Sequence, residues 1–317
     1  MPRSRLIIRQ LDKEAVGLAY ILSWSCGLLI TTMLAVSQVS AQVQDEDVIR
    51  VDVGLVTINV AVKDKKGHPV LGLKAQDFLV ADENKPVVPQ FFDNGGPASI
   101  VFVVDTSSSM LGTKWRNLMA GLKTFLKHAN AENDYTLVAF ADNTRLLAQS
   151  INGTELLKQL SGLHPGGETV LYDGVLLGLV ALERASQRHK ALVLISDGQD
   201  TSSRAGLAEI EKETLARHAT IYAVGILLNQ SCKTFNQDAC HGKEIIERLA
   251  KVTGGLGQFP DSDELAGALK AINSDIISQY SLSYYAPDKR PGWRRVEVTV
   301  AQNVHDSLRY QQRYLMR

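Results

Sequence analysis

The stretch that decides the fold runs from residue 98 to residue 109 and reads ASIVFVVDTSSS. Its continuous apolar run over residues 99–104 is typical of a strand that is buried on both faces in a parallel sheet. Asp105 ends the run, and Ser107 and Ser109 follow at two-residue steps. A loop at this place can turn the three side chains toward one point, where their oxygens suit Mg²⁺, Mn²⁺ or Ca²⁺ rather than zinc. A serine-rich loop that only caps the next helix would look the same.

The chain after this stretch alternates between helical and extended patterns. Helical spacing covers residues 115–126, 154–163, 170–185, 207–217, 244–252 and 265–276, and strand-like runs cover residues 135–140, 146–150, 191–195, 220–227 and 257–259. We expect the run at 146–150 to be an antiparallel edge strand. The alternation predicts a doubly wound α/β domain over residues 98–279, with a central, mostly parallel sheet and ligands at the carboxyl ends of its strands.

Extended patterns flank this domain on both sides. On the N-terminal side apolar and polar residues alternate over 56–62, and short apolar runs follow at 70–73, 78–81 and 87–92, before the breaker Asn94-Gly95-Gly96-Pro97. On the C-terminal side strands are predicted near 280–284, 296–300 and 308–314. These three C-terminal strands have too little surface to bury if they fold alone. We therefore expect residues 280–317 to pair with residues 48–95 in one small β-sandwich that carries the α/β domain as an insertion; a separate C-terminal hairpin is the alternative.

Residues 1–41 have the pattern of a signal peptide. Four basic residues, Arg3, Arg5, Arg9 and Lys13, precede the nineteen uncharged residues 18–36, and Val39-Ser40-Ala41 offers small residues for cleavage. Nineteen apolar residues would also just span a bilayer, so an uncleaved anchor in the inner membrane is the alternative. Either way we expect an exported protein, periplasmic or extracellular, with no other attachment to a membrane.

Charge and cysteine content narrow the function classes. The chain has 34 basic and 34 acidic residues, so no net positive field is available to hold a nucleic acid. Beyond residue 41 the cysteines are Cys232 and Cys240, which lie eight positions apart in a polar stretch. In an oxidising compartment this spacing predicts one disulfide that closes a surface loop, and two free thiols are the alternative.

Motifs for catalysis do not occur in the sequence. It contains no G-x-S-x-G elbow, no Walker G-x-x-x-x-G-K-[ST] and no G-x-G-x-x-G after a strand, so nucleophilic, nucleotide and dinucleotide chemistries lack their signatures. A magnesium site without a general base nearby binds rather than hydrolyses. We expect a non-enzyme, with a Mg²⁺-dependent hydrolase as a remote alternative.

Two further motifs lie where the α/β pattern places ligands. Ile195-Ser196-Asp197-Gly198 ends a second predicted strand with a carboxylate, and Gly166-Gly167-Glu168-Thr169 puts a hydroxyl in a glycine-rich loop before a helix. With the loop after residue 104 they make three oxygen-bearing motifs at one edge of the sheet. The sequence therefore predicts a divalent-cation site from Asp105, Ser107, Ser109, Thr169 and Asp197.

In their order and on these elements, the three motifs resemble the metal-ion-dependent adhesion site (MIDAS) of von Willebrand factor A (VWFA) domains. The resemblance spans residues 98–279 and implies a Rossmann-like fold. More narrowly, GLKAQDF at 72–78, LYD at 171–173 and QYSLSYY at 279–285 are similar to the exported bacterial "VWFA-related" proteins common in acidobacteria. This second resemblance covers nearly the whole chain after the signal segment.

The resemblance implies a role for each site residue. Ser107 and Ser109 would ligate the metal directly, Asp105 and Asp197 directly or through water, and Thr169 would join or leave the ligand set as the domain changes state. One coordination position would stay open for an Asp or Glu of a protein partner, so the implied function is metal-dependent adhesion or assembly. A structural scaffold without metal-dependent binding is the alternative.

Two acidic residues near the motifs need a separate interpretation. Glu168 stands where the family has a small residue beside the threonine, and it would either repel an acidic ligand or help to hold the metal. Asp200 lies three residues beyond Asp197 and is interpreted as a helix-capping or solvated carboxylate rather than a ligand.

Overall fold

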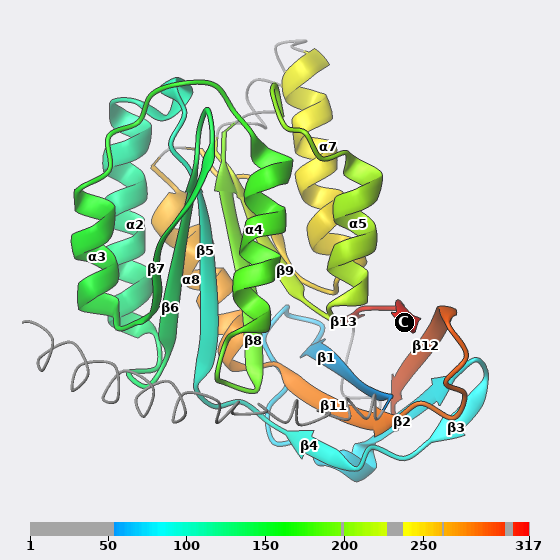
Figure 1. The fold of residues 1–317 in the computed structure, drawn as a ribbon. Coiled ribbons are helices and arrows are strands. Elements are labelled where there is room, and N and C mark those ends of the chain that lie inside the picture. Colours follow the sequence, from blue (N-terminus) through cyan, green and yellow to red (C-terminus); the bar gives the residue numbers. More distant parts are fainter. Residues whose placement is uncertain (1–53, 198–199, 227–236, 262, 302–306, 317) are drawn as a thin grey trace, which may run out of the picture. The chain divides into compact units, whose positions relative to one another are not determined.

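The computed structural model describes residues 54–197, 200–226, 237–261, 263–301 and 307–316 (Figure 1). The predicted signal segment, residues 1–41, lies outside the described residues, and so does Cys232. No helix within the described ranges is long and apolar enough to cross a membrane.

A six-stranded sheet forms the centre of the α/β domain, in the order β10-β9-β8-β5-β6-β7. The strands are β5 (Ala98–Asp105), β6 (Asp134–Phe140), β7 (Thr144–Ile151), β8 (His189–Ser196), β9 (Thr220–Gly225) and β10 (Gly257–Gln258). Every neighbouring pair is parallel except β6 and β7, which run antiparallel. The predicted fold class, including the antiparallel edge strand, is confirmed.

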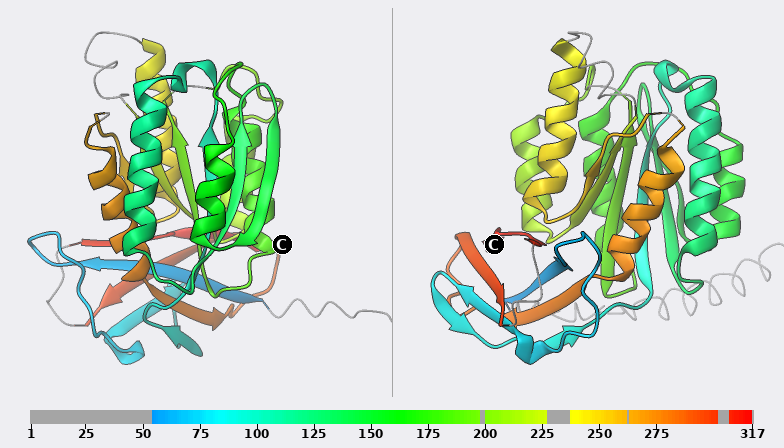
Figure 2. Two further views of the ribbon diagram at one scale, coloured as in Figure 1. Left: turned by 90° about the vertical axis from the view of Figure 1, so that its left-hand side faces the viewer. Right: turned by 180° about the vertical axis from the view of Figure 1, so that it is seen from behind.

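Helices cover both faces of this sheet, as Figures 1 and 2 show. One face packs against α2 (Thr113–His128), α3 (Gly153–Ser161) and α8 (Leu265–Ile277), the other against α4 (Leu171–Glu183), α5 (Leu207–Ala216) and α7 (Gln237–Val252). Phe102 and Val103 point to opposite faces and are both fully buried, as the apolar run predicts. The close approach of α4 requires Gly178, since a Cβ atom there would lie 2.5 Å from Val103 Cγ2.

The N- and C-terminal strands form two facing four-stranded sheets, β13-β1-β11-β4 and β14-β12-β2-β3. They are β1 (Leu55–Lys63), β2 (Phe78–Asp82), β3 (Lys85–Val87), β4 (Phe91–Asp93), β11 (Tyr280–Tyr285), β12 (Gly292–Val300), β13 (Ser307–Tyr310) and β14 (Arg313–Met316). β1 pairs antiparallel with β11, and β2 with β12, so each sheet joins strands from both ends of the chain. Val56, Ile58, Val60 and Val62 are buried between the sheets, as their period of two predicts.

Three of the expected strands are wrong in detail. The run at 308–314 is two strands, β13 against β1 and β14 against β12, because the chain changes sheets at Gln311. The buried Gln311 amide donates hydrogen bonds to the Leu215 and Arg313 carbonyls, both at 2.8 Å. The run at 87–92 is likewise divided between β3 and β4 around Pro89, which cannot donate to a strand ladder. Residues 70–73 form no named strand.

A buried carboxylate connects the α/β domain to the sandwich strands. Asp275 of α8 is 1% exposed and lies 3.2 Å from Lys63 Nζ of β1. Arg309 of β13 forms a second ion pair with the same carboxylate, and the Tyr222 hydroxyl of β9 donates to it at 3.1 Å. Four elements therefore meet at one charged group.

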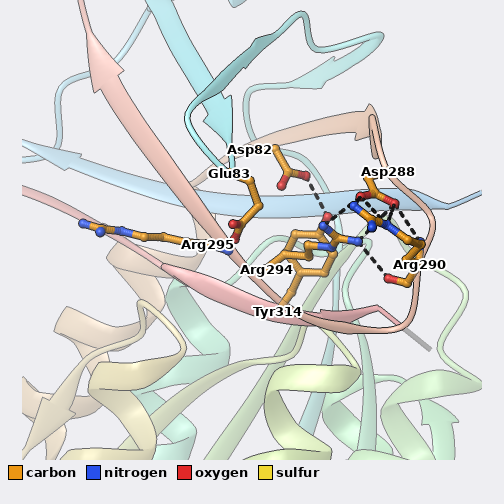
Figure 3. Close-up of polar contacts among 7 residues, drawn as sticks. All are labelled: Asp82, Glu83, Asp288, Arg290, Arg294, Arg295 and Tyr314. Atoms are coloured by element: carbon orange, nitrogen blue, oxygen red, sulfur yellow. Dashed lines mark hydrogen bonds and ion pairs between the residues drawn. The ribbon is translucent and has the colours of Figure 1, made fainter.

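A second buried carboxylate, Asp82, lies inside the sandwich. It accepts hydrogen bonds from the Tyr314 hydroxyl at 2.7 Å and the Tyr284 hydroxyl at 3.1 Å. Burial raises the pKa of both phenols well above the usual range, and the negative charge of Asp82 adds to the effect. Nearby, at the surface, Asp288 pairs with Arg290 and Arg294 (Figure 3).

Candidate metal centre

The predicted site residues come from three loops at the carboxyl edge of the central sheet. β5 and β8 are adjacent and parallel, with Val104 opposite Ile195, so Asp105 and Ser196 follow at the same edge. After β5 the chain turns through a short 3₁₀ helix, Ser108–Met110, and after β8 it reaches Asp197. The third loop, residues 166–169, precedes α4.

Asp105 is fully buried and firmly oriented. One carboxylate oxygen accepts a hydrogen bond from the Ser107 amide at 2.8 Å, and the other accepts one from the Ser196 hydroxyl at 2.5 Å. Burial raises the pKa of the Asp105 carboxyl, and the nearby charge of Asp197 raises it further, against the lowering effect of these hydrogen bonds. A positive ion beside the carboxylate would favour its charged form.

A chain of hydrogen bonds connects the two serines to Asp197. The Ser107 and Ser109 hydroxyl oxygens are 2.9 Å apart, and Ser109 donates to Asp197 Oδ1 at 2.6 Å. The Asp197 side chain is fully buried. Four of the five predicted residues therefore meet in one polar cluster.

The fifth residue, Thr169, is brought to the same edge by its own loop. Ser108 and Gly167 exchange hydrogen bonds, with Ser108 N donating to Gly167 O at 3.1 Å and Gly167 N donating to Ser108 Oγ at 2.9 Å. Gly166 N donates to Thr106 O at 2.7 Å. Thr169 itself is nearly buried and is held through its backbone, whose amide donates to Thr201 Oγ1 at 3.1 Å.

Gly167 is required by the conformation of this loop. Its φ is +93°, in the region that favours glycine, and a Cβ atom would lie 2.5 Å from Asp142 Oδ2. The Asp142 carboxylate approaches so closely because it accepts a hydrogen bond from the Glu168 amide at 2.7 Å. The glycine-rich pattern before Thr169 therefore has a direct geometric cause.

The two other acidic residues near the site, Glu168 and Asp200, both accept hydrogen bonds from nearby protein groups. The Glu168 carboxylate accepts a hydrogen bond from the Ser202 hydroxyl. Asp200 accepts one from the Tyr172 amide, in the first turn of α4, at 3.2 Å, and others from Ser203. Asp200 is thus a capping carboxylate, in agreement with its interpretation from the sequence.

Sequence reasoning missed Lys114, in the first turn of α2. Its ammonium group forms an ion pair with Asp197 Oδ2, and its side chain is 25% exposed. The only signal in the sequence is its position five residues after Ser109, which is also the position of an ordinary solvated lysine on a new helix.

The donor set fits a hard divalent cation. Two carboxylates and neighbouring hydroxyls are the oxygen ligands that Mg²⁺, Mn²⁺ and Ca²⁺ prefer. Within the part of the chain that the structure describes, no three His, Cys, Asp or Glu side chains gather as a metal site. A metal would therefore depend on the serine and threonine hydroxyls.

Fold and site together define an open α/β domain with a cluster of hydroxyls and carboxylates at the carboxyl edge of its sheet. Residues 100–199 match the family model described as von Willebrand factor type A domain, so the chain contains a domain of this type. The narrower resemblance to exported acidobacterial proteins stays a prediction.

Similar proteins include a curated relative and two solved structures. Inter-alpha-trypsin inhibitor heavy chain H2 of Mesocricetus auratus is 26% identical over 204 residues, which is 59% of this chain; the match spans about a fifth (21%) of that protein. A von Willebrand factor type A structure from Catenulispora acidiphila aligns with 83% of this chain and 72% of its own, at 12% identity and a TM-score of 0.48. Proximal thread matrix protein 1 from the mussel byssus, with a zinc-occupied MIDAS motif, aligns with 62% of this chain and 49% of its own, at 16% identity and a TM-score of 0.48.

Proposed function

We propose that this protein is an exported, metal-dependent protein-binding module for adhesion or assembly. The observation that carries the proposal is the convergence of Asp105, Ser107, Ser109 and Asp197 in one hydrogen-bonded cluster at the carboxyl edge of the sheet. The ligand class is a protein that presents an Asp or Glu side chain.

The residues of the cluster divide the work of holding a cation. Ser107 and Ser109 would supply hydroxyl oxygens, while Asp105 and Asp197 would supply negative charge directly or through water. When bound, Mg²⁺, or Mn²⁺ or Ca²⁺ in its place, would supply a positive centre with a coordination position for a partner's carboxylate. Asp105 is already oriented by Ser196, so little rearrangement of that group is needed.

We expect Thr169 to join the metal ligands when a partner is bound and to leave them when it is not. Its backbone amide and carbonyl oxygen are hydrogen-bonded to Thr201, and its hydroxyl makes none of the hydrogen bonds described above between Asp105, the two serines and Asp197. A small movement of the 166–169 loop would bring that hydroxyl to the metal or withdraw it. Thr169 should therefore matter more for partner binding than for metal binding.

The ion pair between Lys114 and Asp197 supports a second candidate, a scaffold without metal-dependent binding. In that case Lys114 would neutralise Asp197 permanently. The two candidates differ in a direct assay, because only the metal-dependent module should capture a partner in Mg²⁺ and release it in EDTA.

The experiment is a pull-down from the envelope of the source organism, with the full chain as bait. We expect capture in Mg²⁺, loss of capture in EDTA, and weak capture by Thr169→Ala although circular dichroism shows an intact fold. A partner whose affinity ignores both EDTA and Thr169→Ala would contradict the proposal and favour the sandwich as the binding surface.

A further inference from the structure

We propose that Lys114 is a built-in competitor of the divalent cation and sets the affinity of the site. The inference rests on the proposed function and concerns the same cluster. It names a residue outside the predicted ligand set that decides how tightly the metal binds.

The geometry places the lysine ammonium where a cation is needed. Of the two Asp197 oxygens, Oδ1 accepts the Ser109 hydroxyl at 2.6 Å and Oδ2 holds Lys114 Nζ. The Asp197 side chain has no exposed surface, so both of its interactions are made inside the protein. Removing one partner of a buried ion pair is strongly destabilising, and Lys114 is the charged partner of Asp197 in this structure.

Charge explains why the metal and the ammonium compete. Asp105 and Asp197 together carry two negative charges, and Lys114 neutralises one of them. A divalent cation in the cluster would leave the ammonium beside a like charge. Like charges repel each other more strongly inside a protein than in water, so holding both cations at Asp197 would weaken metal binding.

The Lys114 side chain can move away from Asp197 when the metal binds. Lys114 lies in the first turn of α2, and its side chain is already 25% exposed. Four methylene groups let a lysine swing its ammonium into water without moving the backbone. At Asp197, the divalent cation therefore replaces the lysine ammonium. Because the Lys114–Asp197 ion pair must break first, the measured affinity for the metal is lower than it would be without Lys114.

A different role for Lys114 predicts the opposite result. If the ammonium stayed in place and oriented Asp197 from outside the ligand set, its removal would weaken metal binding, by about 10- to 100-fold for such supporting groups. The sign of the change in affinity therefore separates competition from support.

The test is calorimetric titration of Mn²⁺ into the full chain and three variants. Lys114→Met removes the charge and keeps the length of the side chain, and we expect at least about tenfold tighter binding because two like charges no longer lie side by side. Lys114→Arg keeps the charge and should bind like the unchanged protein. Lys123→Met removes an exposed lysine from the same helix, so it controls for net charge and should also bind like the unchanged protein. Lys114→Gln repeats the neutral change in case the methionine variant does not fold.

Thermal unfolding supplies a second readout. Without metal, Lys114→Met leaves Asp197 buried beside no ammonium, so its melting temperature should fall below that of the unchanged protein. With Mn²⁺ in excess the difference should shrink or reverse, because a ligand that binds the folded state stabilises it in proportion to its affinity.

The outcomes separate this inference from the function on which it rests. Equal or weaker Mn²⁺ binding by both Lys114→Met and Lys114→Gln would overturn the role of Lys114 and leave the metal site standing. Binding by the neutral variants alone would support competition strongly. No binding by any of the proteins would overturn the proposed function and the role of Lys114 together.

Discussion

Replacing Asp275 by Asn should destabilise the whole folded unit. The Asp275 carboxylate is 1% exposed and is shared by Lys63 Nζ at 3.2 Å, by Arg309 and by the Tyr222 hydroxyl at 3.1 Å. Asparagine keeps the size and one acceptor oxygen but removes the charge. Lys63 and Arg309 would then lie close together without a counter-ion.

The size of this destabilisation follows from how deeply Asp275 and its two cationic partners are buried. Removing one partner of a fully buried ion pair costs about 3–5 kcal/mol. The Lys63 and Arg309 side chains are each 24% exposed, so water screens the remaining cations and the lower end applies. A loss of about 3 kcal/mol lowers the melting temperature of a domain of this size by about 6–12 °C.

Thermal unfolding followed by circular dichroism measures this shift. Glu297→Gln is the matched control, because Glu297 pairs with Arg295 at the surface, where the two side chains are 47% and 74% exposed. The control should melt close to the unchanged protein. An Asp275→Asn protein that melts with the control would refute the argument that this carboxylate joins the sandwich strands to the α/β domain.

Three further predictions concern other parts of the chain. Gly167→Ala should lower stability by about 1–3 kcal/mol, because φ is +93° there and the new Cβ atom would meet Asp142; unchanged denaturant unfolding would contradict this. Because the pKa of the folded Tyr284 phenol is raised, this group contributes its full stability below pH 10.0, the usual pKa of tyrosine, and loses it as the pH rises further. Above pH 10 the Tyr284→Phe protein should therefore lose stability less steeply with pH, by up to about 1.4 kcal/mol per pH unit. Equal slopes in the two proteins would count against this prediction. Cys232 and Cys240 should form a disulfide in protein taken from the periplasm or the medium, and two alkylatable thiols in non-reducing peptide mapping would disprove it.

Much of the fold could be predicted from local patterns. The apolar run before Asp105 is typical of a strand covered on both faces, and the alternation of Val56, Ile58, Val60 and Val62 indicates one buried face; the structure confirms both. The division of the last strand at Gln311 had no local signal. It follows from a buried amide that bonds to the Leu215 carbonyl, nearly a hundred residues earlier in the chain.

The candidate site shows the same difference between local and long-range causes. Parallel strands end at one edge, so Asp105 and Asp197 could be brought together from their positions alone. Lys114 could not be added to them, because a lysine at the start of a helix usually faces water. Its contact with Asp197 depends on how α2 lies over the edge of the sheet, which no spacing in the sequence encodes.

Titration of Mn²⁺ into the unchanged protein, Asp105→Ala, Ser109→Ala and Asp134→Ala tests the central claim most directly. Asp134 is the matched control, because it begins β6 at the end of the strand away from the carboxyl edge and is not one of the predicted ligands. We predict one Mn²⁺ site that is abolished by Asp105→Ala, weakened by Ser109→Ala and retained by Asp134→Ala. Unchanged Mn²⁺ affinity in folded Asp105→Ala and Ser109→Ala proteins would contradict it.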